Sequence, residues 1–341
     1  MKRMRTTQLV KLLAVAFALT LAAAACGSDD DATGTATSEC GSDLAVELGD
    51  SVTDLSVAVV APSAKDDVAF TQSMIDSLAR LGIEPQITDG TFVVEEAAAA
   101  IRAYAEDGID IVIAHGTQYG GSLVEIAPDF PETSFLWGTA EDTQGIANVY
   151  AYFPEADQGG YVNGVIAAKL ADGADIGVVG PVEAGDAVAY IEGFALGAEA
   201  NGASTSIVYT GSFSDVALAT ETAQAHADNG VAILTGTSQS AVGAVNVATA
   251  NDLPWFGTQS NTEAWSSDLT VASQVYHWDV VISTMIEQIE DGTLGGEAMG
   301  LTLENGGLVM EFNGCFDLDS DVRADAEATI DDIIAGDIKT N

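Results

Sequence analysis

The sequence predicts an α/β fold built from two doubly wound, parallel-sheet lobes. Short β-branched apolar runs, typical of buried parallel strands, alternate with helical patterns from residue 55 onward. The alternation occurs in two series, which indicates two parallel sheets with helices on both faces. The two series also resemble each other, because residues 57–62 and 176–181 align in a way that superposes Asp67 on Asp186.

The first series begins with a strand at residues 55–61, which ends before Pro62. A helix is expected from Asp67 to residue 81, where Gly82 ends it. The elements that follow are a strand at 85–88, a helix at 93–106, a strand at 110–114, a helix at 120–126, and strands at 134–137 and 148–153.

The second series follows an expected helix at residues 159–171. Its elements are a strand at 176–179, a helix at 186–200, a strand at 206–209, a helix at 215–228, a strand at 231–234, a helix at 240–250 and a strand at 255–256. A helix at 278–290 is then expected to cross between the lobes. Residues 229–251 are uncharged, but polar residues cluster at their centre, so no membrane helix is predicted.

The charge balance excludes one class of function. The 341 residues contain 10 Lys and Arg against 52 Asp and Glu, a formal charge of −42, which excludes nucleic-acid binding through phosphate attraction. A mean hydropathy of +0.22 excludes a disordered chain. We interpret the acidic excess as a solvating surface. Calcium binding at residues 317–321 is less favoured, because this segment lacks the central Gly and terminal Glu of a calcium loop.

The N-terminus resembles the export signal of a bacterial lipoprotein. Basic residues flank and enter an apolar run that ends in four alanines before Cys26. We expect residues 1–26 to comprise the signal peptide and a lipidated Cys26, and residues 27–54 to form a flexible tether. An ordinary signal peptide cut near Cys26 is the alternative. The expected location is the extracytoplasmic face of the cell membrane, through a lipid anchor.

The remaining cysteines, Cys40 and Cys315, would lie in an oxidising compartment, so we expect a disulfide between them, with two free thiols as the alternative. No cysteine spacing resembles a zinc motif and no glycine pattern matches a dinucleotide loop, so neither a metal nor a cofactor is expected. His115 follows a strand without a nucleophile elbow or a nearby Ser or Asp partner. We therefore expect no enzyme activity, with a hydrolase as a minor alternative.

The candidate site lies on the loops that follow the strands, where ligands of open α/β sheets bind. These loops carry aromatic and amide side chains but one cation, Lys65, which favours a neutral or cationic ligand over a nucleotide. Opposed rings from the two lobes are expected to sandwich a flat ligand. For Phe70 and Tyr190 core packing is the alternative, and for Phe213 it is favoured. The predicted ligand-binding residues are Asp67, Phe70, Thr71, His115, Gln118, Tyr119, Asp186, Tyr190, Gln239, Gln259 and Trp278.

Five segments resemble the basic membrane lipoprotein family, the substrate-binding lipoproteins of ABC importers that include purine nucleoside receptors. The similarity extends over about residues 55–339. Three of the five segments lie in expected helices: Asp-Val-Ala-Phe-Thr-Gln-Ser at 67–73, Gln-Gly-Gly-Tyr-Val-Asn-Gly-Val-Ile-Ala-Ala-Lys at 158–169 and Tyr-Ile-Glu-Gly-Phe-Ala-Leu-Gly-Ala at 190–198. The other two segments are Tyr-Thr-Gly-Ser-Phe-Ser-Asp at 209–215 and Val-Tyr-His-Trp-Asp at 275–279.

This resemblance implies a type I periplasmic-binding fold, with three crossovers and a hinge between lobes that close on the ligand. The implied lobes are residues 55–154 with 276–294, and 155–275 with 295–341. The resemblance implies that Asp67 and Phe70 bind a ring and that Tyr190 faces it. Two residues depart from the family pattern: Thr71 replaces an Asn, and Gln259 stands where nucleoside receptors place an Asp that grips the ribose.

The function expected from the sequence is that of a monomeric, lipid-anchored receptor of an ABC importer. It would capture a small neutral heterocycle, a purine nucleoside or nucleobase, and deliver it to permease subunits in the membrane. A receptor of the same fold for a sugar, a peptide or another small solute is one alternative. A sensory partner of a signalling protein is another.

Overall fold

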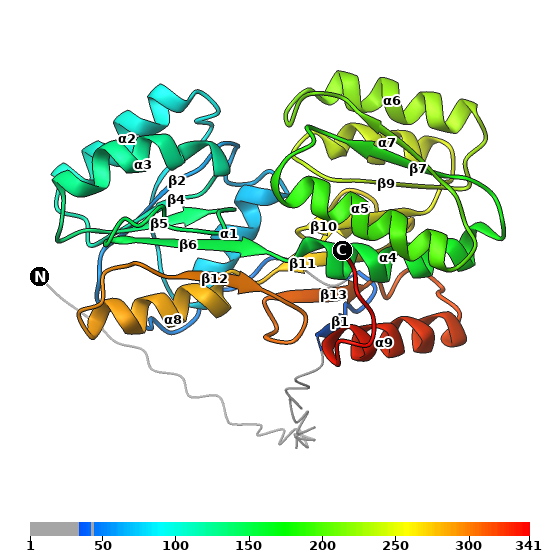
Figure 1. Cartoon of the computed structure of the whole chain (residues 1–341). Helices are drawn as coiled ribbons and strands as arrows, with labels where there is room; N and C mark the ends of the chain where they lie inside the picture. Colours follow the sequence, from blue (N-terminus) through cyan, green and yellow to red (C-terminus); the bar gives the residue numbers. More distant parts are fainter. Residues whose placement is uncertain (1–33, 42–43) are drawn as a thin grey trace, which may run out of the picture. The chain divides into compact units, whose positions relative to one another are not determined.

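The computed structural model describes residues 34–41 and 44–341. The expected signal segment with Cys26, and the first residues of the expected tether, lie outside the described residues. Within the described part the chain forms two sheets, each with helices on both faces (Figure 1). None of the helices described there is long and apolar enough to cross a membrane.

The first sheet has six strands, all parallel. They are β2 (Val57–Val60), β3 (Gln86–Thr88), β4 (Ile111–Ala114), β5 (Ser134–Gly138), β6 (Val149–Pro154) and β12 (Ala298–Leu301), in the order β12-β6-β5-β4-β2-β3. The helices beside them are α1 (Phe70–Arg80), α2 (Val94–Glu106), α3 (Gly120–Ile126) and α8 (Asp279–Glu290), with the short 3-10 helices η1 (Thr117–Tyr119) and η2 (Ala127–Asp129). Successive residues of a strand point to opposite faces of the sheet. Val59 therefore packs in the core under α1 and α8, and Val60 packs in the core under α2 and α3.

The second sheet has seven strands and is parallel except where β11 meets β13. Its strands are β1 (Thr35–Thr37), β7 (Ile176–Gly180), β8 (Thr205–Tyr209), β9 (Ile233–Gly236), β10 (Trp255–Gln259), β11 (Thr270–Tyr276) and β13 (Leu308–Phe312), in the order β1-β13-β11-β10-β9-β7-β8. Its helices are α4 (Ala156–Ala171), α5 (Gly185–Ala200), α6 (Val216–Asp228), α7 (Ala241–Ala250) and α9 (Ser320–Ile334), with the 3-10 helix η3 (Thr262–Ala264). Helices α6 and α7 cover one face, and α4 and α5 the other (Figure 1).

The chain passes between the sheets four times in this part of the molecule. It begins in the second sheet with β1 and enters the first sheet at β2. It then leaves the first sheet from β6 into α4, returns from β11 into α8, and leaves again from β12 into β13. The α/β fold with two parallel-sheet lobes is therefore as the sequence predicted.

The last crossing corrects one expected boundary. Residues 295–341 were assigned to the second lobe, but Ala298–Leu301 pairs with Ala151–Pro154 at the edge of the first sheet. Only β13 and α9 lie with the second sheet. An edge strand of four residues carries too short an apolar pattern to be assigned to a sheet from sequence.

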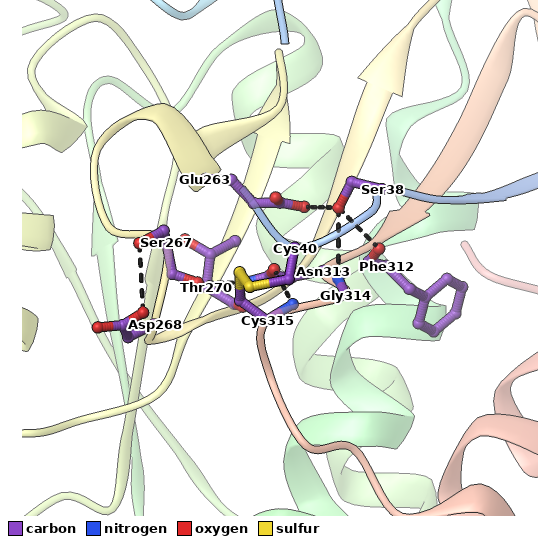
Figure 2. The surroundings of a disulfide bond; sticks show 10 residues. All are labelled: Ser38, Cys40, Glu263, Ser267, Asp268, Thr270, Phe312, Asn313, Gly314 and Cys315. Carbon is purple, nitrogen blue, oxygen red and sulfur yellow. Dashed lines mark hydrogen bonds between the residues drawn. A yellow bond between two sulfur atoms is a disulfide. The ribbon is translucent and has the colours of Figure 1, made fainter. Parts of the chain in front are cut away.

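The expected tether is also partly ordered. Strand β1 pairs with β13, and the disulfide between Cys40 and Cys315 holds it there (Figure 2). The Ser38 hydroxyl donates to Glu263 at 2.6 Å beside this disulfide. Further along, the backbone N–H of Gly49 donates to the carbonyl of Ala79 at the end of α1. Residues 34–41 thus belong to the second sheet rather than to a free linker.

Two motifs that carry the family resemblance pack α4 against α5. A Cβ added at Gly164 would lie 2.1 Å from the carbonyl oxygen of Phe194, and one added at Gly193 would lie 2.2 Å from that of Asp157. The two backbones therefore approach closely at the glycines. These motifs set the position of α5, whose first turn carries Asp186.

Candidate functional site

A cavity of about 380 Å³ lies where the carboxyl ends of the strands of both sheets meet. This is the position at which open α/β sheets bind ligands, and the volume suits a small molecule. The first lobe contributes residues after β2, β3, β4 and β5, and the second lobe residues after β7, β8, β9 and at the end of β10. The lining residues are Pro62, Phe70, Phe92, Val94, Gly116, Thr117, Gln118, Thr139, Ala184, Asp186, Phe213, Gln239 and Gln259.

Phe70 is the first residue of α1, and Asp67 sets the start of that helix. The Asp67 carboxylate accepts the N–H groups of Ala69 and Gln72 at 2.9 and 3.0 Å, and the Ser63 hydroxyl at 2.6 Å. Burial raises the pKa of Asp67, while these hydrogen bonds act in the opposite direction. Asp67 therefore satisfies the free N–H groups of the helix start and does not line the cavity.

An aromatic cluster supports Phe70 from behind. The His115 ring stacks on Phe70 with centroids 4.0 Å apart and planes 7° apart, and Trp278 meets both rings edge-on. The Nε2 of His115 contacts the Phe70 carbonyl at 3.1 Å, and its Nδ1 contacts the Tyr152 hydroxyl at 2.8 Å. A carbonyl accepts only, so Nε2 carries the proton and Nδ1 accepts. Burial lowers the pKa of His115 to about 3, which keeps the ring neutral.

The second lobe supplies a wall of amides and one carboxylate. Gln259 ends β10 with a left-handed φ of 77°, and its side-chain Nε2 donates to Oδ2 of Asp186 at 3.0 Å. The Tyr276 hydroxyl donates to the same oxygen at 3.1 Å. Burial raises the pKa of Asp186, opposed by these two donors and by nearby backbone N–H groups of α5. The Oε1 atoms of Gln259 and Gln239 are buried and have no partner.

Five of the predicted residues come together in the lining: Phe70, Gln118, Asp186, Gln239 and Gln259. The other six do not line the cavity. Asp67, His115 and Trp278 support Phe70, as described above.

The remaining three are held in hydrogen bonds away from the cavity. Thr71 is buried against the Ser63 hydroxyl, and the Tyr119 hydroxyl donates to the Thr91 carbonyl. Tyr190, expected to face Phe70, is fully buried in the second lobe, where its hydroxyl contacts Asn163 and Thr235 at 3.0 Å each. That expectation is corrected, because these contacts hold Tyr190 in the core.

Phe213 takes the place expected for Tyr190, since it is the aromatic side chain of the second lobe that lines the cavity. Phe92 and Val94 are lining residues that the sequence reasoning missed. Residues from 93 onward were interpreted as the start of a helix. The missed signal was an aromatic residue in the loop between β3 and α2, where Phe92 is 39% exposed.

The lining contains no Lys, Arg or His, and Asp186 is its one ionisable acid. Three aromatic rings, two from the first lobe and one from the second, give it a largely apolar character. Among the described residues no group of three or more His, Cys, Asp and Glu side chains is arranged to hold a metal ion. The arrangement suits a neutral, flat molecule with a polar edge.

Known proteins match this chain in both sequence and fold. A family model described as "ABC transporter substrate-binding protein PnrA-like" matches residues 55–336. A purine-binding protein of Brucella abortus is 26% identical over 245 residues, which are 71% of this chain and 69% of that protein. A solved ABC transporter solute-binding protein of Conexibacter woesei has a TM-score of 0.71 and 26% identity, over 84% of this chain and 98% of that one. Another, from Aeropyrum pernix, has a TM-score of 0.72 and 20% identity, over 84% and 92%.

Proposed function

Because the chain belongs to the family of PnrA-like ABC transporter substrate-binding proteins, we propose that its cavity captures a purine nucleoside or nucleobase for import. One observation carries the proposal: aromatic rings of both lobes meet in a cavity that has no cationic side chain. A flat neutral ring gains stacking and apolar burial there, whereas a phosphate finds no cation to pair with. The printed name of the Brucella abortus relative, a purine-binding protein, points to the same ligand class.

Capture follows from the connections between the lobes. Four chain crossings join them, and the cavity draws its lining from both. A ligand that contacts Phe70 on one side and Phe213 on the other stabilises the closed arrangement by its differential affinity for it. The closed form is then the one that the permease recognises.

We also propose that the chain acts as a monomer at the extracytoplasmic face, held by lipid on Cys26. The support is the apolar run before Cys26 and its small residues. Expression of the full chain and of Cys26→Ser in a bacterial host tests this. We expect the native chain in the membrane fraction and Cys26→Ser outside it, whereas equal partition of the two chains overturns the anchor.

Calorimetric titration tests the ligand class, with separate panels of purine nucleosides, nucleobases, sugars and amino acids. We expect purines alone to bind, and a thermal shift to accompany binding, since ligand at about 100 times Kd adds about 2.7 kcal/mol of stability. Binding of a sugar or an amino acid with no purine binding overturns the proposal. Chemical conversion of a bound purine overturns the receptor function itself.

A further inference from the structure

Asp186 is the one charged group among the described residues that line the cavity. Its Oδ2 accepts the side-chain N–H of Gln259 and the Tyr276 hydroxyl, which are both neutral donors. Asp186 takes part in none of the ion pairs within the described part of the chain. Burial raises the pKa of Asp186, and only neutral hydrogen-bond donors oppose this effect. The carboxylate therefore has a negative charge that a ligand can neutralise.

The aromatic rings of the lining also attract a positive charge. The face of an aromatic ring is electron-rich, so a cation within about 6 Å of its centre is attracted to it. Phe70, Phe92 and Phe213 line the cavity. The ring stacked behind Phe70 is His115, and burial lowers the pKa of His115 to about 3, so no positive charge lies there to repel a cation. The three rings and the carboxylate are the groups that bind a cationic ring.

A second cavity, of about 620 Å³, adjoins the first, since Thr139 and Asp186 line both. No Lys, Arg or His among the described residues lines it, and its other acidic residues are Glu141, Glu155, Asp157 and Glu192. Burial raises the pKa of Glu155, and the charges of Asp157 and Glu141 raise it further. Lys65, the one cation of the predicted site loops, lines neither cavity. The electrostatic potential at the ligand cavity is therefore negative, with the same sign as the net charge of −42.

We propose that the cavity binds a purine nucleoside with a positive charge on its ring more tightly than a neutral one of the same size. This inference rests on the proposed function, and within its ligand class it favours purines alkylated or protonated at a ring nitrogen. A neutral purine meets no opposing charge in the cavity, whereas a cationic purine gains attraction to the ring faces and to Asp186. The cationic ring lies between Phe70 and Phe213, with its charged edge toward Asp186.

Two isomers test the preference, because they have the same heavy atoms and differ in charge. The ring of 1-methyladenosine carries a positive charge at neutral pH, and that of N6-methyladenosine is neutral. Calorimetric titration of the full chain with each isomer, and with adenosine, should give a Kd about 5- to 50-fold lower for 1-methyladenosine than for N6-methyladenosine. Sodium chloride should weaken the binding of 1-methyladenosine alone, since screening acts on a charged ligand.

Two variants assign the preference to the carboxylates. Asp186→Asn keeps an acceptor for Gln259 and Tyr276 and removes the charge, so it should reduce the preference about three- to tenfold. Glu155→Gln removes a charge from the adjoining cavity and should reduce the preference about twofold, because this charge is farther from the ligand.

Glu106→Gln is the matched control for both variants. Glu106 is exposed at the end of α2 and lines neither cavity. The control changes the net charge by the same amount and should leave the preference unchanged. Circular dichroism and the melting temperature verify that each variant is folded.

The outcomes separate this inference from the function on which it rests. Equal or tighter binding of N6-methyladenosine, or a preference for 1-methyladenosine that salt does not reduce, overturns the inference and leaves the purine receptor standing. Binding of adenosine without binding of 1-methyladenosine overturns it as well. A preference that Asp186→Asn and Glu155→Gln leave unchanged, or that Glu106→Gln reduces equally, overturns the role of the cavity carboxylates. Absence of binding by every purine, neutral or charged, overturns the proposed function, and this inference with it.

Discussion

Phe70 offers the ligand one ring face, because its other face is covered by His115 at a centroid distance of 4.0 Å. Stacking of a nucleobase on an aromatic side chain contributes about 1–3 kcal/mol. We therefore expect Phe70→Ala to weaken purine binding about 5- to 150-fold in calorimetric titration. Affinity within about twofold of the native value would remove Phe70 from the site.

Tyr190→Phe is the matched control for that substitution. The variant removes a hydroxyl that contacts Asn163 and Thr235 in the core and does not touch the cavity lining. We expect a loss of about 1 kcal/mol in the free energy of unfolding, with unchanged purine affinity. Weaker purine binding in a folded Tyr190→Phe variant would show instead that the Tyr190 hydroxyl takes part in binding.

His115 makes part of the stability depend on pH. Burial lowers its pKa from 6.5 to about 3, so between these values the unfolded chain takes up a proton that the folded chain does not. The contribution of the neutral ring is complete above pH 6.5 and is lost as the pH falls toward 3. We expect His115→Gln to be less stable than the native chain at neutral pH, with a gap that narrows by up to about 1.4 kcal/mol per pH unit on acidification.

Urea unfolding of both chains at several pH values measures this gap. Gln keeps an N–H donor for the Phe70 carbonyl but has no titrating group. A gap that stays constant between neutral pH and about pH 5 would show that His115 does not carry the pH dependence.

The internal similarity of the two lobes explains why Tyr190 was misplaced. The alignment that superposes Asp67 on Asp186 brings Phe70 opposite Ala189, one residue short of Tyr190. One residue along a helix turns a side chain by about 100°, enough to direct it from the cavity to the core. Residue type and position after a strand were enough to predict Asp186, Gln239 and Gln259 in the cavity lining. The direction of the Tyr190 side chain could not be predicted in this way, because it depends on how helix α5 packs against the second lobe.

At the scale of elements, the close contact of α4 and α5 predicts intolerance to a single methyl group. Gly164→Ala places a Cβ 2.1 Å from the backbone oxygen of Phe194, and a backbone atom cannot move aside as a flexible side chain can. We expect a loss of about 3 kcal/mol or more in the free energy of unfolding. Gly121→Ala in α3 is the control, since its Cβ would meet nothing within 4 Å.

The control should gain stability by up to about 1 kcal/mol, because Ala restricts the unfolded chain and favours a helix. Thermal and urea unfolding of the two variants under the same conditions measure both effects. Equal stability of Gly164→Ala and Gly121→Ala would contradict the close approach of the two helices.

The disulfide links the segment that follows β1 to the segment that follows β13. Cys40 and Cys315 are 275 residues apart in sequence, and the bond holds β1 against β13. We expect the Cys40→Ser/Cys315→Ser variant to lose about 2–4 kcal/mol of stability. Purine affinity should stay unchanged, because neither the cysteines nor β1 line the cavity. A weaker ligand affinity in the folded double variant would show instead that the disulfide influences the ligand-binding cavity.

The elements that the sequence predicted are those with strong periodicity. Buried strands such as β4 and helices such as α2 appear within a few residues of their expected bounds. Strands β1, β11, β12 and β13 and helix α9 were not predicted. Strands β1 and β12 carry little hydrophobic pattern, because they have three or four residues at a sheet edge. Their positions depend on partners far away in sequence: β13 with the disulfide for β1, and β6 for β12.

For the whole molecule, the net charge of −42 governs how stability responds to salt. Arg80, Arg102, Lys169 and Arg323 are the cations with an ion pair in the described part of the chain, against 52 acidic residues in the full sequence. Most carboxylates therefore repel one another across the surface. Screening shortens the range of this repulsion to about 10 Å at 0.1 M salt and about 3 Å at 1 M.

We therefore expect sodium chloride to raise the free energy of unfolding, with most of the rise below about 0.5 M, where screening changes most. Sucrose at equal osmolality separates this effect from general exclusion of solute from the surface, which grows steadily with concentration. A cavity without cations that binds a neutral purine should show an affinity nearly independent of salt over the same range, whereas a Kd that rises steeply with salt would indicate a charged ligand. A melting temperature that falls with added chloride would contradict the repulsive surface, and would require the carboxylates to be held by cations that the salt displaces.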